Sequence, residues 1–133
     1  MLVPGETRRQ LETQTMQYML LIMGDESRMN PPEVEDTGMS ADHHAYTQAL
    51  LKAGAMRGGE RLHPTSSAST VKVRDGKAVV LDGPYVESQE QLGGYYLIEA
   101  ASLDEAIEWA VKCPAAAHGA IEVRPVWPTR ADA

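Results

Sequence analysis

Two adjacent histidines, His43 and His44, are the side chains best suited to acid–base chemistry near neutral pH. Neighbouring side chains on a helix point about 100° apart, so the pair cannot share one metal ion. The helical phase set by Tyr46 predicts that His43 faces the interior and His44 faces solvent. Burial and the helix dipole both disfavour imidazolium, so we expect a lowered pKa for His43. Its neutral imidazole would then act as a base, or would hold a structural position at the polar rim of the core.

The sequence Asp82-Gly83-Pro84 is the second place where chemistry is expected, with Glu87 close behind it. Carboxylates at the mouth of a cleft do acid–base work or hold a cation. A purely structural turn is the alternative, because an Asp side chain accepts hydrogen bonds from nearby backbone N–H groups while Gly and Pro fix the dihedrals. The spacing of these residues within a loop does not decide between a carboxylate site and a structural turn. The candidate catalytic residues are therefore His43 and Asp82.

Arg124 lies in the last strand-like segment and is a candidate clamp for an anionic group of a substrate. An ion pair with a carboxylate of either subunit is the alternative role. Tyr95 and Tyr96 point to opposite faces of a strand, so one is expected in the core and the other at an interface or cleft. The candidate ligand-binding residues are Tyr85, Glu87, Tyr96 and Arg124.

No metal ion or cofactor is expected. Cys113 is the single cysteine, which excludes an intramolecular disulfide and a cysteine-based zinc site. At a helix C-terminus its thiol gains no dipole that would lower its pKa, so a nucleophilic role is not expected. The sequence contains no phosphate-binding loop, nucleophile elbow or dinucleotide-binding fingerprint.

The composition indicates a single acidic domain. Among 133 residues, 12 Lys and Arg face 19 Asp and Glu, and the net charge of -7 argues against nucleic-acid binding. The apolar run at 18–23 is too short to cross a membrane, and residues 1–15 do not read as a secretory signal. A lone thiol fits a reducing compartment, so a cytoplasmic protein is expected.

The elements that must position these residues begin near Met16. We expect a flexible N-terminal extension over residues 1–15, one α+β domain over 16–128 and a polar tail over 129–133. Strands are predicted over 17–23, 55–62, 95–100 and 120–126, and a hairpin is predicted over 70–81 across Asp75-Gly76. Two prolines predict that the stretch 24–39 contains no helix.

Two helices are predicted, one from Ser40 or Asp42 to Gly54 and one from Ser102 to Pro114. Each should pack through an apolar stripe at helical spacing. The first stripe is Tyr46, Ala49, Leu50 and Ala53, and the second is Leu103, Ala106, Ile107, Ala110 and Val111.

This order predicts a split βαβ arrangement with an inserted hairpin: an antiparallel sheet with two helices on one face. The other face would be bare. Because a bare apolar face usually finds a partner, and a symmetric dimer is the simplest one, we expect a homodimer through the open sheet face.

Several motifs in this chain resemble the DGPF-motif branch of the YCII-related (YciI-like) family. The resemblance covers about residues 16–127. Its motifs are Asp82-Gly83-Pro84-Tyr85-Val86-Glu87, Gln91-Leu92-Gly93-Gly94-Tyr95-Tyr96, Leu103-Asp104-Glu105-Ala106, Trp109-Ala110, Cys113-Pro114-Ala115 and Glu122-Val123-Arg124-Pro125-Val126.

The resemblance implies a ferredoxin-like domain that dimerises through its sheet, as in dimeric α/β-barrel proteins. It places the family histidine at His43, three residues before Tyr46. The sister branch has an aspartate before a proline after the second helix, where this chain has Cys113. The implied His–Asp partnership is therefore absent.

Two hypotheses of different classes remain open. In the first, the chain binds a small molecule in a cleft between the first helix, the sheet and the 82–87 loop, with acid–base catalysis by His43. In the second, it is a non-catalytic interaction or ligand-sensing module associated with transcription regulation, as a companion of a sigma factor. The absent His–Asp partner favours the second.

Overall fold

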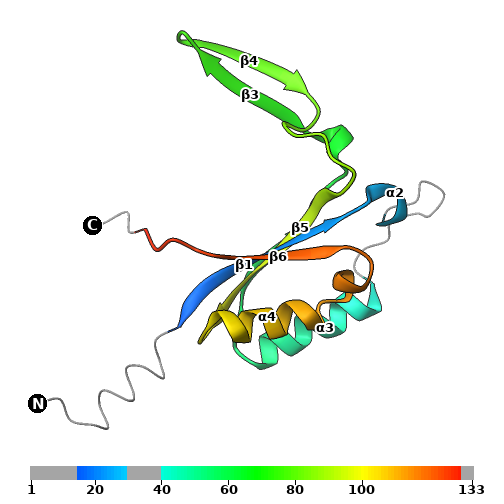
Figure 1. The fold of residues 1–133 in the computed structure, drawn as a ribbon, viewed down its shortest axis with the longest axis vertical. Coiled ribbons are helices and arrows are strands. Elements are labelled where there is room, and N and C mark those ends of the chain that lie inside the picture. Colours follow the sequence, from blue (N-terminus) through cyan, green and yellow to red (C-terminus); the bar gives the residue numbers. More distant parts are fainter. Residues whose placement is uncertain (1–14, 30–39, 130–133) are drawn as a thin grey trace, which may run out of the picture.

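A computed structural model describes residues 15–29 and 40–129 of the chain (Figure 1). The predicted extension and tail therefore fall almost entirely outside the described residues. The strands are β1 (Met16–Gly24), β2 (Met56–Arg61), β3 (Ser69–Arg74), β4 (Lys77–Asp82), β5 (Gln91–Ala100) and β6 (Ala120–Pro125). The helices are α2 (Glu26–Met29), α3 (Ala41–Lys52) and α4 (Leu103–Lys112), with 3₁₀ turns η1 (Thr65–Ser67) and η2 (Pro114–Ala117).

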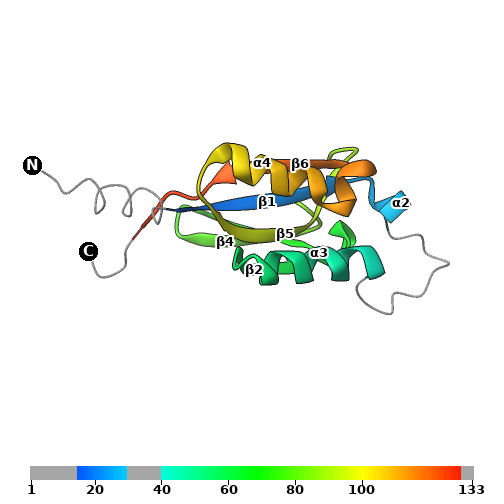
Figure 2. The ribbon, with the colours of Figure 1, turned by 90° about the horizontal axis from the view of Figure 1, so that it is seen from below.

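The main sheet has four strands in the order β2-β5-β1-β6, and each neighbouring pair is antiparallel. Helices α3 and α4 lie side by side against one face of it (Figure 2). This is the α+β class predicted from the sequence, and the strand order is consistent with a ferredoxin-like fold.

Strands β1 and β5 hold the core because their side chains alternate. Tyr18, Leu20 and Ile22 of β1 are buried toward the helices, as are Tyr96 and Ile98 of β5. Alternation and register place the residues between them on the opposite face. We call this the free face; it is formed by Met19, Leu21, Met23, Tyr95 and Leu97. These side chains are partly exposed, and no described helix lies against them (Figures 1 and 2).

Helix α3 begins where Ser40 caps it, because the Ser40 hydroxyl accepts a hydrogen bond from the backbone N–H of His43 at 3.2 Å. It ends before Gly54, whose φ of +71° favours glycine. The predicted stripe was too wide: only Tyr46 and Leu50 are buried. The helix lies beside the edge strand β2 and packs through one i, i+4 row, so the alanines of the stripe stay exposed.

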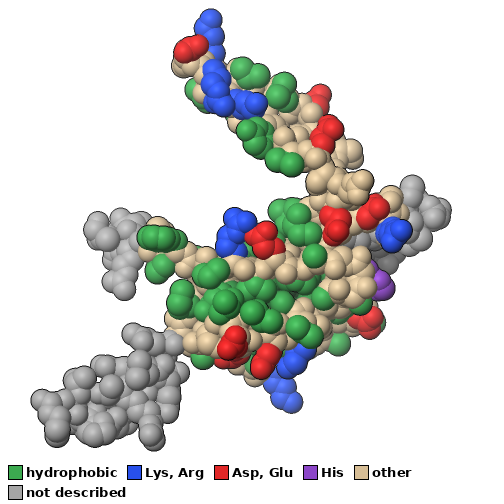
Figure 3. Space-filling model, viewed as in Figure 1, with side chains coloured by type: hydrophobic (Ala, Val, Ile, Leu, Met, Phe, Trp, Pro, Cys, Tyr) green, Lys and Arg blue, Asp and Glu red, His purple; other side chains and the backbone are tan. Residues whose placement is uncertain are grey.

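Helix α4 begins at a capping box. The Ser102 hydroxyl accepts from the N–H of Glu105 at 3.2 Å, and the Glu105 carboxylate accepts from the N–H of Ala101 at 3.0 Å. Its predicted stripe is also only partly correct, since Ala106 and Ala110 are buried while three larger members are exposed: Leu103, Ile107 and Val111. Figure 3 shows apolar side chains gathered on this side of the molecule, over α4 and β6.

Strands β3 and β4 pair across Asp75 and Gly76, whose φ angles of 53° and 76° are both positive, as a two-residue hairpin turn requires. The pair forms a sheet of its own and is bonded to none of the four strands of the main sheet. It stands away from the main sheet on the side opposite to α3 and α4 (Figures 1 and 2).

The stretch predicted to lack helix contains one short helical turn, α2. The Asp25 carboxylate accepts from the N–H of Ser27 at 2.9 Å, and the side-chain oxygen of Gln91 accepts from the N–H of Glu26 at 3.0 Å. These acceptors satisfy the first N–H groups of the turn, which ends before the prolines. The prediction of no helix was wrong for 26–29, and residues 30–39 lie outside the described residues.

Candidate functional site

The His43 side chain on α3 meets the hydroxyl group of Tyr96 on β5. Its Nδ1 lies 3.4 Å from the phenolic oxygen of Tyr96. The same oxygen lies 3.2 Å from Oγ1 of Thr47, one helical turn after His43. We call these three residues the His43 cluster. Its imidazole is partly buried whereas His44 is exposed, so the helical phase predicted from Tyr46 is confirmed.

Burial lowers the pKa of His43 below its ordinary value of 6.5. The positive charge of Arg61 lowers this pKa further, and the negative charge of Asp42 opposes the shift. The imidazole is therefore neutral at pH 7. Burial also raises the pKa of Tyr96, against the opposing effect of its hydrogen bond with Thr47, so its phenol keeps its proton.

Tyr46 supports the cluster from beneath. Its hydroxyl donates to the backbone carbonyl of Trp109 at 2.7 Å, which ties α3 to α4. Its ring meets the ring of Tyr96 edge-on, with centroids 5.2 Å apart. Burial raises the pKa of Tyr46, and the nearby Cys113 adds to the shift. These contacts hold the Tyr46 ring in place, and the Tyr46 ring in turn supports the ring of Tyr96.

Cys113 is buried in the core and free of any disulfide. Burial raises the pKa of its thiol, so the group is neutral and unsuited to nucleophilic attack. Cys113 belongs to the same cluster of buried residues as Tyr46 and Tyr96, and its ionised form would raise the pKa of both phenols. The position at which the resemblance led us to look for a carboxylate therefore holds an uncharged group here.

Three predicted site residues lie on the hairpin side of the main sheet. Asp82 ends β4 opposite Ser69 and is exposed, as are Tyr85 and Glu87. The Tyr85 ring lies 5.1 Å from the ammonium of Lys72 on β3. Because α3 covers the other face, the structure brings His43 together with Tyr96 but not with these three residues (Figures 1 and 2).

Arg124 also lies away from His43. It is opposite Met19 in the sheet register, on the side of the free face, and its guanidinium pairs with the carboxylate of Glu122. Both side chains are largely exposed. The structure thus shows the ion pair that was the alternative to an anion clamp.

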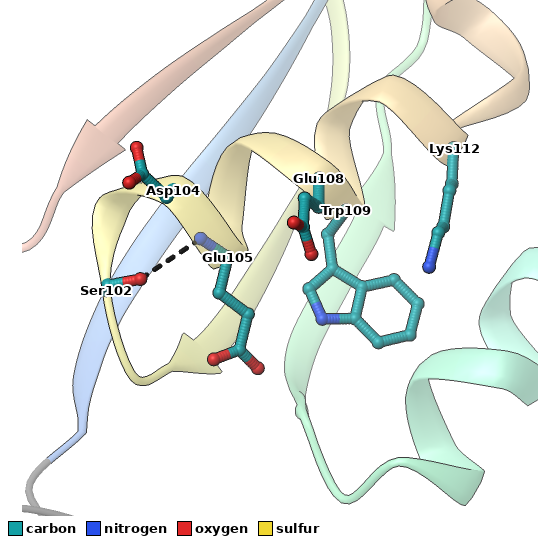
Figure 4. Close-up of a pocket in the computed structure, with 6 residues that line it drawn as sticks. All are labelled: Ser102, Asp104, Glu105, Glu108, Trp109 and Lys112. Carbon is teal, nitrogen blue, oxygen red and sulfur yellow. Dashed lines mark hydrogen bonds between the residues drawn. The ribbon is translucent and has the colours of Figure 1, made fainter.

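Two shallow hollows lie on the outer surface of the helices, apart from the imidazole. One of about 400 Å³ is lined by Ser102, Asp104, Glu105, Glu108, Trp109 and Lys112 (Figure 4). The other, of about 380 Å³, lies between α3 and α4 and shares Trp109 and Lys112 with the first. The Lys112 ammonium lies 5.1 Å from the centroid of the Trp109 ring. The Lys112 ammonium thus already lies over the indole that lines both hollows. The hollows therefore offer less defined chemistry than the His43 cluster.

Sequence reasoning missed Thr47, although it lies four residues after His43 and so on the same side of the helix. It also missed Arg61, which stands opposite Gly94 in the register between β2 and β5, two positions from Gly59, the residue opposite Tyr96. Among residues 15–29 and 40–129, no three His, Cys, Asp or Glu side chains gather as metal ligands would. None of the helices within those ranges is long and apolar enough to cross a membrane.

Comparison with known proteins identifies the family. The chain matches the YCII-related domain over residues 16–130, which include all the described strands and helices. It belongs to the YCII-related family. The chain is also similar to an uncharacterised protein of Rhizobium meliloti (strain 1021), which is 39% identical over 114 residues, covering 84% of this chain and 92% of that protein. The family predicted from the motifs is confirmed.

Proposed function

We propose that this YCII-related protein binds a small molecule at the His43 cluster, with His43 as the acid–base residue. The observation that carries the proposal is the contact between the His43 imidazole and the Tyr96 phenol. A partly buried imidazole that is neutral near pH 7 is a suitable base, and a phenol that keeps its proton orients it.

The distances allow more than one arrangement of protons, and the proposal uses the following one. If Nδ1–H of His43 donates to the Tyr96 oxygen, and the Tyr96 hydroxyl donates to Oγ1 of Thr47, then Nε2 carries a lone pair. That nitrogen is the one that would accept a proton from a ligand. In this arrangement Thr47 is a positioning residue, because its oxygen accepts the phenol proton.

A thermal-shift screen of small metabolites tests this proposal, with His44→Ala as the matched control in the same helical turn. We expect a compound that raises the melting temperature of the wild type and of His44→Ala but not of His43→Ala or Tyr96→Phe. A compound that raises all four equally would overturn the site assignment.

We propose, in addition, a homodimer of the dimeric α/β-barrel type, formed through the free face. The support is that Met19, Leu21 and Leu97 remain partly exposed there, with both long helices on the other side (Figure 2). Sedimentation at 100 μM tests it: a species at twice the 14.5 kDa chain mass is expected, and a 14.5 kDa species would contradict it.

Asp82 as a second catalytic residue, and Tyr85, Glu87 and Arg124 as ligand contacts, remain proposals. Arg124 lies on the side of the free face and Asp82 ends a strand of the β3–β4 hairpin, so a ligand that met them together with His43 would have to span both sides of the sheet (Figure 1). A cytoplasmic location is likewise proposed, on the lone thiol of Cys113.

The second candidate function is a non-catalytic interaction or ligand-sensing module associated with transcription regulation. The neutral thiol of Cys113 near Tyr96 favours it, because the cluster then lacks a carboxylate to stabilise imidazolium. NMR of the bound compound after incubation separates the two functions. Chemical conversion that His43→Ala abolishes supports the enzyme, whereas recovery of the unchanged compound supports the sensing module.

A further inference from the structure

Arg61, the last residue of β2, lies on the same face of the main sheet as the phenol of the His43 cluster. Gly59 stands opposite Tyr96 in the antiparallel pair of β2 and β5, and residues directly opposite each other share a face. Side chains alternate along a strand, so the next residue of β2 on that face is Arg61. Because Tyr96 is buried toward the helices, Arg61 is on the α3 side of the sheet.

Helix α3 places His43 at the same end of the sheet. Three residues join the helix to β2, and the N–H of Ala55 donates to the carbonyl of Leu50 at 2.9 Å. The chain therefore reverses its direction tightly, with the end of α3 at the start of β2. The first turn of α3 lies over the other half of β2, because His43 contacts Tyr96. That is the half of the strand that ends at Arg61.

The neighbouring charges make the environment of the imidazole positive. Burial is the largest cause of the lowered pKa of His43, the positive charge of Arg61 comes second, and the opposing negative charge of Asp42 comes third. The free N–H groups of the first turn of α3 add partial positive charge. The imidazole and the phenol of Tyr96 are both uncharged at pH 7, so the cluster itself adds no negative charge.

A guanidinium beside a neutral imidazole is suited to an organic anion. Arginine presents five N–H donors in a planar fork that matches a carboxylate. Arg61 is exposed and also interacts with the protein, and five donors allow it to keep such a contact while it binds a ligand. A single guanidinium balances one negative charge, and the nearby Asp42 disfavours a phosphate dianion.

We propose that the ligand of the His43 cluster is a small organic anion whose carboxylate is bound by Arg61, beside the imidazole of His43. The inference rests on the function proposed above and names the substrate class of that site. A carboxylate bound there would also stabilise the imidazolium that forms when Nε2 accepts a proton. The ligand would thus supply the negative charge that the neutral thiol of Cys113 does not.

Arg57 gives a matched control in the same strand, because its guanidinium pairs with the Glu99 carboxylate at 2.7 Å. NMR titration, with the His43 signal assigned by its loss in His43→Gln, tests the placement of Arg61. Arg61→Gln should raise the midpoint of His43 by at least about 0.3 pH units, and Arg57→Gln should leave it unchanged. Arg61→Lys retains the charge and should retain the midpoint. An unchanged midpoint in Arg61→Gln would overturn the inference.

Thermal shifts with matched acids and amides, at constant pH and ionic strength, test the ligand class. The pairs are lactate with lactamide, succinate with succinamide and benzoate with benzamide, together with each compound found in the metabolite screen and its neutral analogue. We expect an acid to raise the melting temperature of the wild type and of Arg57→Gln, but not of Arg61→Gln or His43→Ala. Its amide should raise none of them.

The outcomes separate the ligand class from the site. A compound that stabilises the wild type and Arg61→Gln equally, but not His43→Ala, would refute the carboxylate contact and leave the proposed function standing. An amide that stabilises the wild type as well as its acid does would also refute the contact. If no compound distinguishes the wild type from His43→Ala, the proposed function and the ligand class fail together.

Discussion

The two sides of the four-stranded sheet have different kinds of packing. On the helix side, Leu20, Leu50 and Ile98 are fully buried, and the polar groups of the His43 cluster contact one another. On the other side stand partly exposed sheet residues and the β3–β4 hairpin, which we call the arm and whose valines are in water. Helices cover the first side, and no described helix covers the second (Figure 2). We infer that stability depends mainly on the first side and assembly on the second.

The largest expected effect tests this division directly. Leu50→Ala should lower the free energy of unfolding by about 2–5 kcal/mol, because it leaves a cavity beneath α3. Val73→Ala on the arm should change the free energy of unfolding of the monomer by less than about 0.5 kcal/mol. Urea denaturation at low protein concentration measures both. Similar losses for the two variants would show that the arm belongs to the core.

A smaller effect is expected from single hydroxyl groups on the two sides. Tyr46→Phe removes the donor to the Trp109 carbonyl and should lower the free energy of unfolding by about 1 kcal/mol. Tyr85→Phe should leave it unchanged, because that side chain is exposed. Thermal unfolding of both variants makes the comparison, and equal stability of Tyr46→Phe and wild type would contradict the link between α3 and α4.

The pH dependence of the free energy of unfolding tests the burial of His43 on the helix side of the sheet. The pKa of His43 is lowered in the folded protein, so between that pKa and 6.5 the unfolded chain binds more protons. Stability contributed by the neutral imidazole is fully present above about pH 6.5 and is lost as pH falls through the folded pKa. His43→Gln should flatten this part of the stability profile. NMR titration should place the His43 midpoint below 6.5, and a midpoint at 6.5 would show a solvated ring.

The smallest effect is expected at the exposed ion pair. Glu122→Gln removes the partner of Arg124 and should change the free energy of unfolding by less than about 1 kcal/mol. If Arg124 is instead an anion clamp, Arg124→Ala should abolish the thermal shift given by an anionic compound while Glu122→Gln preserves it. If both variants keep the thermal shift, the ion pair is the role of Arg124.

Local patterns in the sequence predicted the framework well. The apolar run of β1, the Ser40 and Ser102 caps and the Asp75-Gly76 turn all depend on neighbouring residues, so the sequence alone predicts them, although the alternating burial along β1 was not predicted. The widths of the helical stripes were wrong because the exposure of Ile107 depends on where α4 lies across the sheet. That position is set by packing between distant segments.

The candidate site was predicted in part for the same reason. His43 could be oriented from the phase of its own helix, and strand alternation left Tyr96 one of two possible faces. Their contact joins residues 53 positions apart, and no local pattern reports it. The position of Asp82 depends on the direction in which the arm leaves the sheet, which the turn sequences do not determine.

The aromatic contacts beneath the cluster make Trp109 an optical reporter of this site. The indole meets Tyr46 edge-on with centroids 6.1 Å apart, and Tyr46 meets Tyr96 in the same way. Fluorescence of the indole should therefore respond when a ligand displaces the Tyr96 ring. The sequence contains one other tryptophan, Trp127, which is 85% exposed, and Trp127→Phe would leave a single emitter. Ligand binding could then be followed in real time without a label.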